Sequence, residues 1–174
     1  DPVNYVDSEN EEDSRTAVGR LIKRGHNRVL FVCDGQNSSA RQLRLRGYRR
    51  ALADHGITPD DSLVLMDDDH AGKFKNALET LFAKNPPTAV FGANFFMTCR
   101  CLEIIGTKRF GIAVTVYDDW EDTIASFGIP YTAIVQPTAA IGRTAIETMY
   151  GLLRGTVVAP VQIKLASTLV EKTA

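Results

Sequence analysis

Polar side chains that could bind a ligand follow the ends of several apolar segments in this chain. Asp34 to Ser38 follow RVLFVC, Asp67 to His70 follow LVLM, and Asn94 follows TAVFGA. A further apolar segment, ending VTVY, runs into the adjacent carboxylates Asp118 and Asp119. A carboxylate in such a place can accept hydrogen bonds from the vicinal hydroxyls of a sugar or nucleoside. These groups are therefore candidates for one polyol-binding cleft.

Two other roles are open for the carboxylates after VTVY. Together with the run DDDH, from Asp67 to His70, they could ligate Mg²⁺, which takes oxygen ligands. An aspartate ahead of WEDTIASFG could also cap a short helix. From the residues alone, the polyol contact, the metal site and the helix cap remain alternatives.

Arg44 lies in a segment that carries five arginines between Arg41 and Arg50. Such a run is ordinarily a solvated helix face, and a nucleic-acid-binding helix is the alternative. An arginine early in this helix could instead reach over the cleft and donate a fork of hydrogen bonds to hydroxyls or a carboxylate. No nucleophile with a base nearby and no phosphate-binding loop emerges, so we expect neither an enzyme nor a cofactor.

The elements that position these residues alternate between strand and helix. This alternation predicts an α/β fold with a doubly wound, mostly parallel sheet flanked by helices. In such sheets ligands bind beyond the carboxyl ends of the strands. Strands are expected at 28–33, 63–66, 88–93, 112–117 and 161–170, with one more ending at Gln136, and helices at 14–24, 38–56, 73–83, 97–105 and 138–154.

Size and composition describe a single soluble domain. The chain has 174 residues, 44% of them hydrophobic and 24% charged, and a net charge of −1. A chain so close to neutral has no overall attraction to nucleic acid or an anionic membrane. No apolar run reaches the ~20 residues that cross a bilayer. Three cysteines in apolar or helical sequence predict reduced thiols in a cytoplasmic protein.

In their order, five motifs of the chain resemble the effector-binding domain of the LacI/GalR (lactose-repressor/galactose-repressor) family of bacterial transcription regulators. The resemblance covers essentially the whole chain and implies the C-terminal lobe of a type I periplasmic-binding-protein-like fold. That lobe would comprise 8–134 and 156–174, and the helix at 137–155 would belong to the other lobe. The motifs are ENEEDSRTAVGRLIKRGHNRVLFV, RLRGYRRAL, PPTAVFGAN, VTVYDDWEDTIASFGIPYTAIVQPTAAIG and LASTLVEK.

The same resemblance implies a set of ligand-binding residues. Arg44, Asn94, Asp118 and Gln136 fall on family positions that contact or frame the effector, and Glu11 lies near the lobe junction. Asp68 takes the position of an aromatic residue that stacks on a sugar or base. Because an aspartate cannot stack, we expect weak binding of unmodified hexoses.

Further departures from the family pattern also concern the cleft. Phe95 stands where an aspartate usually follows the asparagine, Val116 replaces a glycine, and Lys172 replaces a terminal arginine. These changes favour an effector more polar or cationic than a conventional sugar, or a cleft that binds weakly.

The resemblance implies the ligand-sensing and dimerisation part of a transcription regulator. Its effector would be a sugar or related polyol, its partner a second copy, and operator DNA would be bound only through an N-terminal headpiece absent from the chain. A free periplasmic-type sugar-binding protein is one alternative. A Mg²⁺-dependent hydrolase that uses Asp67, Asp69 and Asp118 is another.

The helix expected at 138–154 carries an apolar stripe. Its residues recur at helical spacing: Ile141, Ala145, Met149, Leu152 and Leu153. A stripe of this size is unusual in water, so we expect a second copy of the chain, or other residues, to cover it.

Overall fold

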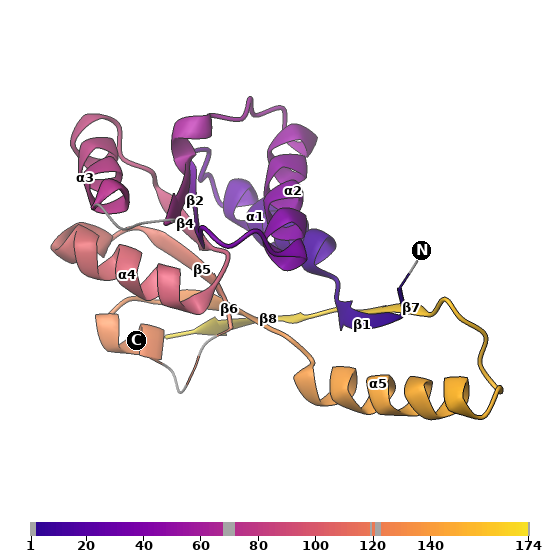
Figure 1. The fold of residues 1–174 in the computed structure, drawn as a ribbon. Helices are drawn as coiled ribbons and strands as arrows, with labels where there is room; N and C mark the ends of the chain where they lie inside the picture. Colours follow the sequence, from indigo (N-terminus) through magenta and orange to yellow (C-terminus); the bar gives the residue numbers. More distant parts are fainter. Residues whose placement is uncertain (1–2, 68–71, 119, 121–122, 174) are drawn as a thin grey trace.

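The computed structural model describes residues 3–67, 72–118, 120 and 123–173. Its centre is a six-stranded sheet in the order β3-β2-β4-β5-β6-β8 (Figure 1). The first five strands in this order are parallel, and β8 is antiparallel to β6. The predicted doubly wound, mostly parallel sheet is confirmed. The strands are β2 (Val29–Asp34), β3 (Val64–Asp67), β4 (Ala89–Gly92), β5 (Ala113–Tyr117), β6 (Tyr131–Val135) and β8 (Thr168–Lys172).

Helices cover both faces of this sheet. In Figure 1, α1 (Asn10–Lys23) and α2 (Ser39–Asp54) lie on one side of the strands, and α3 (Lys73–Lys84) and α4 (Phe95–Ile105) on the other. Short 3-10 segments occupy Asp61–Leu63, Gly106–Arg109 and Thr123–Phe127. Among the described residues, no helix has the length and apolar character needed to span a membrane.

The continuous apolar run of β2 follows from these two layers. Val29, Phe31 and Cys33 belong to the core under α1 and α2, and Leu30 and Val32 belong to the core under α3 and α4. Successive side chains of a strand point to opposite faces, so a strand covered on both faces is apolar at every position. The predicted buried strand is therefore confirmed.

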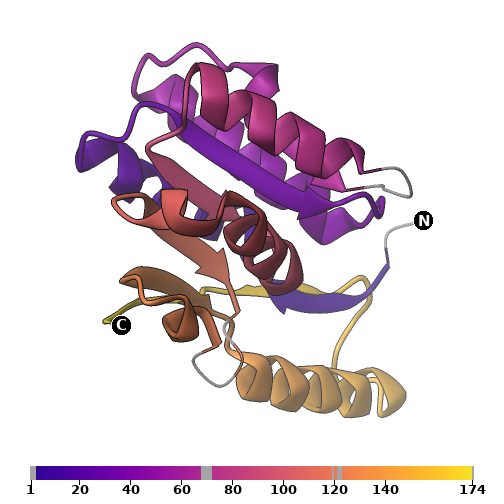
Figure 2. The same cartoon turned by 90° about the vertical axis from the view of Figure 1, so that its left-hand side faces the viewer.

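A smaller unit, called the arm here, consists of β1, β7 and α5. The strands β1 (Tyr5–Ser8) and β7 (Gln162–Leu165) pair in parallel as a separate two-stranded sheet, and α5 (Thr138–Leu153) contacts β1. Both views show α5 standing apart from the six-stranded sheet (Figures 1 and 2). None of the residues of α5 is buried.

The single strand predicted at 161–170 is wrong, because this segment forms β7 and β8 in two different sheets. The break falls at Ala166 and Ser167. There the carboxylate of Asp13 on α1 accepts hydrogen bonds from the Ser167 backbone N–H at 3.1 and 3.3 Å and from its hydroxyl at 2.5 Å. Burial raises the pKa of Asp13, and the hydrogen bonds from Ser167 oppose that rise.

Two helices begin earlier than predicted. The helix expected from Ser14 begins at Asn10, and the one expected from Met97 begins at Phe95. In the second case Asn94 is the N-cap, since its side-chain oxygen accepts the Met97 N–H at 2.9 Å. The prediction placed the turn at the wrong residues because Phe95 and Phe96 are poor markers of a helix start.

Candidate functional site

The polar residues of interest gather at the carboxyl edge of the parallel strands. From β2 the chain passes to β3 on one side and then to β4 on the other, so the strand order switches between β2 and β4. In open α/β sheets the crevice at this point is where ligands bind. Asp34 ends β2, Asn94 follows β4, and Asp118 follows β5. The strand-end residues expected to bind a ligand therefore lie at the carboxyl edge of the sheet, at or next to the switch point.

Arg44 reaches this edge from α2. Its side chain is only 9% exposed, its Nε donates to Asn10 Oδ1 at 2.7 Å and its Nη1 to the Ala93 carbonyl at 2.6 Å. Its Cζ lies 3.7 Å from the centre of the Tyr117 ring, within range of a cation–π contact. Burial raises the pKa of Tyr117 well above its usual range, so the ring stays neutral beneath the guanidinium.

Asp118 is held from the neighbouring strand. Gln136, just after β6, donates its Nε2 to both carboxylate oxygens at 3.0 and 2.8 Å, and the Ser8 hydroxyl donates to Gln136 Oε1 at 2.7 Å. Asp118 has φ +55°, the left-handed region that aspartate tolerates better than most residues. This geometry favours Asp118 as a hydrogen-bond acceptor for a ligand, and Asp119, the other candidate for a helix cap, lies outside the described residues.

Asn94 joins the ends of β2 and β4. Its Nδ2 donates to Asp34 Oδ2 at 2.5 Å while its Oδ1 caps α4. No described residue accepts the second N–H of the Asn94 amide, so this N–H is a candidate donor to a ligand. Asp67 lies opposite Asp34 in the register of β2 and β3 and accepts a hydrogen bond from Arg100 of α4. The Arg100 guanidinium therefore supplies the positive charge that the metal hypothesis assigned to Mg²⁺ beside this carboxylate.

The structure brings Arg44, Asn94, Asp118 and Gln136 to the same edge, but it places Glu11 elsewhere. The Glu11 carboxylate pairs with Arg50 at 2.8 Å and Arg46 at 3.1 Å, which lie along α2. The hydrogen bond from Arg50, together with the contacts of Arg46, holds its pKa below the usual range. Asp68 lies outside the described residues.

The departures from the family pattern have different consequences. Val116 is fully buried in the core under α3 and α4, so the expectation that its replacement of a glycine concerns the cleft is wrong. Phe95 packs partly against the same core. Lys172 ends β8, with its Nζ 6.0 Å from the centre of the Tyr131 ring.

Sequence reasoning missed two exposed aromatic side chains at this edge, Phe96 and Trp120, which contact each other and Phe95. Each lies two residues after a predicted site residue, Asn94 or Asp118. Large apolar side chains so close in sequence to Asn94 and to Asp118 were the signal that could have indicated an aromatic surface at the site.

The cysteines and the acidic side chains bear on whether the described part of this edge could carry covalent or metal chemistry. Cys33 and Cys101 are buried, which raises the pKa of each thiol to about 12. Among the described residues, no group of three or more His, Cys, Asp or Glu side chains could hold a metal ion. Asp69, which the hydrolase hypothesis needs, lies outside them.

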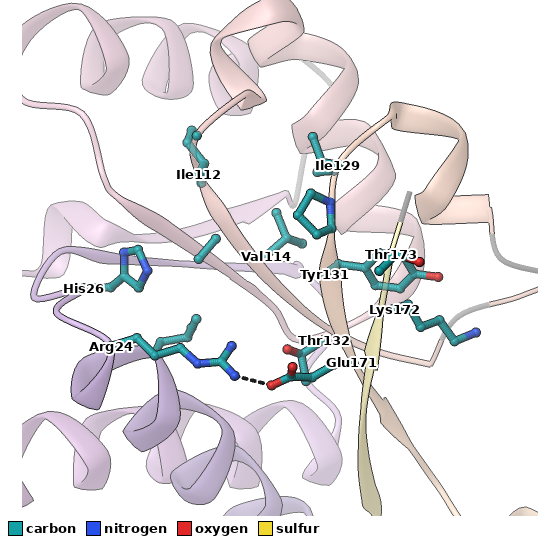
Figure 3. Close-up of a pocket in the computed structure, with 14 residues that line it drawn as sticks. Arg24, His26, Ile112, Val114, Ile129, Tyr131, Thr132, Glu171, Lys172 and Thr173 are labelled. Atoms are coloured by element: carbon teal, nitrogen blue, oxygen red, sulfur yellow. Dashed lines mark hydrogen bonds and ion pairs between the residues drawn. The ribbon is translucent and has the colours of Figure 1, made fainter.

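A cavity of about 440 Å³ opens at the opposite edge of the sheet (Figure 3). It lies where β5 and β6 begin and β8 ends, and its rim includes His26, Thr132 and the ion pair between Arg24 and Glu171. None of the predicted site residues lines it. We place the candidate site at the carboxyl edge, because polar side chains from five elements meet there with defined hydrogen bonds.

A doubly wound sheet with polar side chains gathered at its switch point defines a domain that binds small molecules. Comparison with known proteins makes this class more specific. The family model of the periplasmic binding protein-like domain matches residues 18–173. The chain therefore belongs to the periplasmic binding protein-like domain family, in the form found as the effector-binding domain of LacI-family regulators.

Two curated relatives illustrate the relationship. The chain is 32% identical over 169 residues to the transcriptional regulator CelR of Thermobifida fusca, covering 94% of this chain and 49% of CelR. It is 27% identical over 178 residues to the lactose operon repressor of Escherichia coli K12, covering 99% of this chain and 48% of the repressor. The chain thus spans about half the length of the curated relatives it matches.

Solved structures agree with this assignment. A CelR–cellobiose complex superimposes with a TM-score of 0.80 at 30% identity, covering 99% of this chain and 54% of that one. The E. coli transcriptional repressor ascG superimposes with a TM-score of 0.75 at 20% identity, covering 97% of this chain and 67% of that one. At the lower identity, the likeness concerns the fold alone.

Proposed function

We propose that this chain is the ligand-sensing part of a bacterial transcription regulator. It binds a small polyol effector at the carboxyl edge of its sheet, and this occupancy controls operator binding by a part of the regulator outside these 174 residues. The observation that carries the proposal is the paired arrangement of Arg44 and Asp118. The buried guanidinium of Arg44 is a hydrogen-bond donor on the helix after β2, and the Asp118 carboxylate is an acceptor after β5, with β4 between these two strands.

The hydrogen bonds already made suggest which groups contact the ligand. Gln136 uses its oxygen on Ser8 and its nitrogen on Asp118, so it positions the carboxylate and contributes little to the ligand itself. The Asp118 oxygens keep lone pairs, Asn94 keeps one N–H, and within the described residues Arg44 Nη2 makes no hydrogen bond. Acceptors and donors together fit a molecule rich in hydroxyls.

The relatives support this class of ligand and function. The relatives named above are transcription regulators, and one of the matched structures is described as a complex with cellobiose. We therefore propose a non-enzymatic, cytoplasmic protein that works as a homodimer. An effector shifts the conformational equilibrium of such a regulator only to the extent that it binds one conformation more tightly than the other.

The two alternatives have less support. The hydrolase hypothesis needs free carboxylates, yet Asp67 is paired with Arg100 and Asp118 is bound by Gln136. A free periplasmic sugar-binding protein has the same fold, but the curated relatives named above are regulators.

A thermal-shift screen of the chain against neutral polyols, including glucose, ribose, inositol, cellobiose and adenosine, tests the proposal. A ligand that binds only the folded state raises the melting temperature in proportion to the logarithm of its excess over Kd. Arg44→Lys and Asp118→Asn are each expected to weaken binding at least about tenfold, equivalent to about 1.4 kcal/mol. Asparagine also tolerates the left-handed backbone at 118.

Arg49→Lys is the matched control for Arg44→Lys. Arg49 lies on the same helix, but it is half-exposed and paired with Asp61, so this variant should bind as the wild type does. If no polyol stabilises the chain at millimolar concentration, or if both site variants bind like the wild type, the proposal is wrong.

A further inference from the structure

The aromatic cluster of Phe95, Phe96 and Trp120 forms a wall beside the polar site. Phe95 and Phe96 open α4 directly after Asn94, and Trp120 follows Asp118 by two residues. The centre of the Trp120 ring lies 6.3 Å from that of Phe95, with the rings nearly parallel at 16°, and 6.0 Å from that of Phe96, at 63°. Such spacings are typical of contacting aromatic pairs.

The wall is fixed on one side and open on the other. Phe95 packs against the core under α3 and α4, which anchors the cluster. Phe96 is 68% exposed and Trp120 is 64% exposed, so two large apolar side chains stand in water next to each other. An exposed apolar surface of this kind, bordered by polar groups, is typical of a binding site.

The chemistry of the two neighbouring surfaces is complementary. Arg44, Asn94 and Asp118 offer hydrogen bonds, and Phe96 with Trp120 offers an apolar surface. A sugar ring has both characters, with hydroxyls around its edge and C–H groups on its faces. Phe96 lies two residues after Asn94 and Trp120 two residues after Asp118, so we expect a saccharide held by these polar groups to extend a second ring against the wall.

We propose that the wall of Phe96 and Trp120 binds a second sugar ring, so that the effector is a disaccharide or longer saccharide and not a monosaccharide. This inference rests on the function proposed above and specifies its ligand. Two exposed side chains are too few for a stable protein interface, which buries well over 1,000 Å². The 63° angle between Phe96 and Trp120 also gives no pair of parallel faces to hold a flat base.

The chain contains a single tryptophan, Trp120, so its fluorescence reports on the wall alone. The experiment titrates the whole chain with glucose, galactose, cellobiose, maltose, lactose and adenosine, and follows Trp120 emission, acrylamide quenching and thermal shift together. One disaccharide is expected to bind at least about tenfold more tightly than its constituent monosaccharide, to change the emission and to protect Trp120 from acrylamide.

Variants separate the wall from the polar groups. Trp120→Ala and Phe96→Ala, measured by thermal shift, are expected to weaken disaccharide binding at least about tenfold and monosaccharide binding less than about threefold. Phe110→Ala is the matched control, because Phe110 is also an exposed phenylalanine, 56% exposed, but lies ahead of β5 at the other edge of the sheet. That variant should bind as the wild type does.

The outcomes distinguish this inference from the proposed function. If a polyol binds through Arg44 and Asp118 while Trp120 emission stays unchanged and Trp120→Ala binds normally, the wall has no such role, although the function stands. A preference for adenosine, no preference for any disaccharide, or protection of Trp120 by a second copy without ligand would each overturn the inference. If no polyol binds at all, the proposed function fails first.

Discussion

Glu11 shows how a carboxylate that resembles a ligand contact can be engaged elsewhere. The resemblance placed it near the lobe junction, but its side chain is 24% exposed and bridges Arg46 and Arg50 of α2. Its neighbour Asn10 is the residue that contacts Arg44. Two adjacent residues of α1 therefore differ in role: Asn10 supports the site through Arg44, whereas Glu11 links α1 to α2.

Glu11→Gln is expected to lower the free energy of unfolding at neutral pH by no more than about 1 kcal/mol, since its arginine partners are largely solvated. The folded pKa of Glu11 lies below its ordinary value of 4.5. Its contribution is therefore present above that value and lost as pH falls through the folded pKa. Urea unfolding should show a lower free energy of unfolding for Glu11→Gln than for the wild type at pH 7, and no difference between the two proteins at pH 3.

Glu103→Gln, at an exposed glutamate of α4, serves as the control and should be neutral at both pH values. A Glu11→Gln variant that instead loses effector affinity with unchanged stability would show that Glu11 contacts the ligand after all.

At the scale of elements, the contact between α1 and α2 determines where Arg44 lies. Gly47 allows the two helices to approach closely: a Cβ at this position would lie 2.1 Å from the Glu11 carbonyl oxygen and 2.7 Å from Ser14 Cβ. Ser14 in turn contacts the Tyr117 hydroxyl at 3.0 Å. The packing of the two helices and the geometry of the site are therefore connected.

Gly47→Ala is expected to destabilise the chain by about 1–3 kcal/mol or more, because the added methyl meets backbone and the helices must move apart. Gly142→Ala on α5 is the matched control. Its Cβ would meet nothing within 4 Å, so the gain in helix propensity should stabilise by about 0.5–1 kcal/mol. Equal effects of the two substitutions in urea unfolding would contradict the close approach.

The break between β7 and β8 gives a second prediction at this scale. Asp13→Ala removes the acceptor of the Ser167 N–H and hydroxyl, and is expected to lower stability by about 1–3 kcal/mol at neutral pH. Because burial raises the Asp13 pKa, this carboxylate binds protons more tightly folded than unfolded, and its ionisation costs stability as pH rises. Asp13→Asn, which keeps an acceptor and avoids that cost, should be the milder variant.

The sequence was sufficient for elements whose pattern is local. The apolar run of β2 and the serine-capped α2 were predicted because their signals lie within each segment. The sequence did not predict β1, whose partner β7 lies about 150 residues away, or the break at Ser167, which depends on Asp13.

The same limit applies to the site. Asn94, Asp118 and Gln136 follow strand ends, where position follows from the fold, whereas Arg44 lies within α2. The contact between Phe96 and Trp120 could not be predicted, because it depends on how the start of α4 packs against the segment after β5.

For the whole molecule, the arm raises the question of what covers α5. Ala145, Met149 and Leu152 of the predicted stripe line a gap against β1, but Ile146 is 55% exposed and Leu153 is 75% exposed. We propose that α5 belongs to the other lobe of a two-lobe domain, as the resemblance implies, and that β1 and β7 join it, although β7 falls in the range 156–174 first assigned to the C-terminal lobe. Alone, the chain exposes an apolar surface that favours pairing with a second copy.

We expect the 174-residue chain to self-associate at micromolar concentration, as measured by light scattering. Replacing both Ile146 and Leu153 with Glu should shift the population toward monomers, because charge on the exposed face opposes apolar contact. Phe110→Glu, at an exposed apolar residue of the other sheet edge, should leave the association unchanged. A wild-type chain that is monomeric and binds no apolar dye would contradict the prediction.

Among the described residues, the chain passes between the six-stranded sheet and the arm at Ser8–Asn10, at Gln136–Thr138 and at Leu165–Thr168. These tethers are fastened side by side, by Ser8 to Gln136 at 2.7 Å and by the Glu9 N–H to the Leu165 carbonyl at 3.0 Å. Because the three crossings are joined at one place, we expect any motion of the arm to be a hinge rotation about them and not a sliding motion. Gln136, which holds Asp118, lies at this hinge. A molecule that competes with Gln136 for Asp118 would therefore change the contacts at the hinge itself, and a small displacement there would produce a larger displacement at the far end of α5.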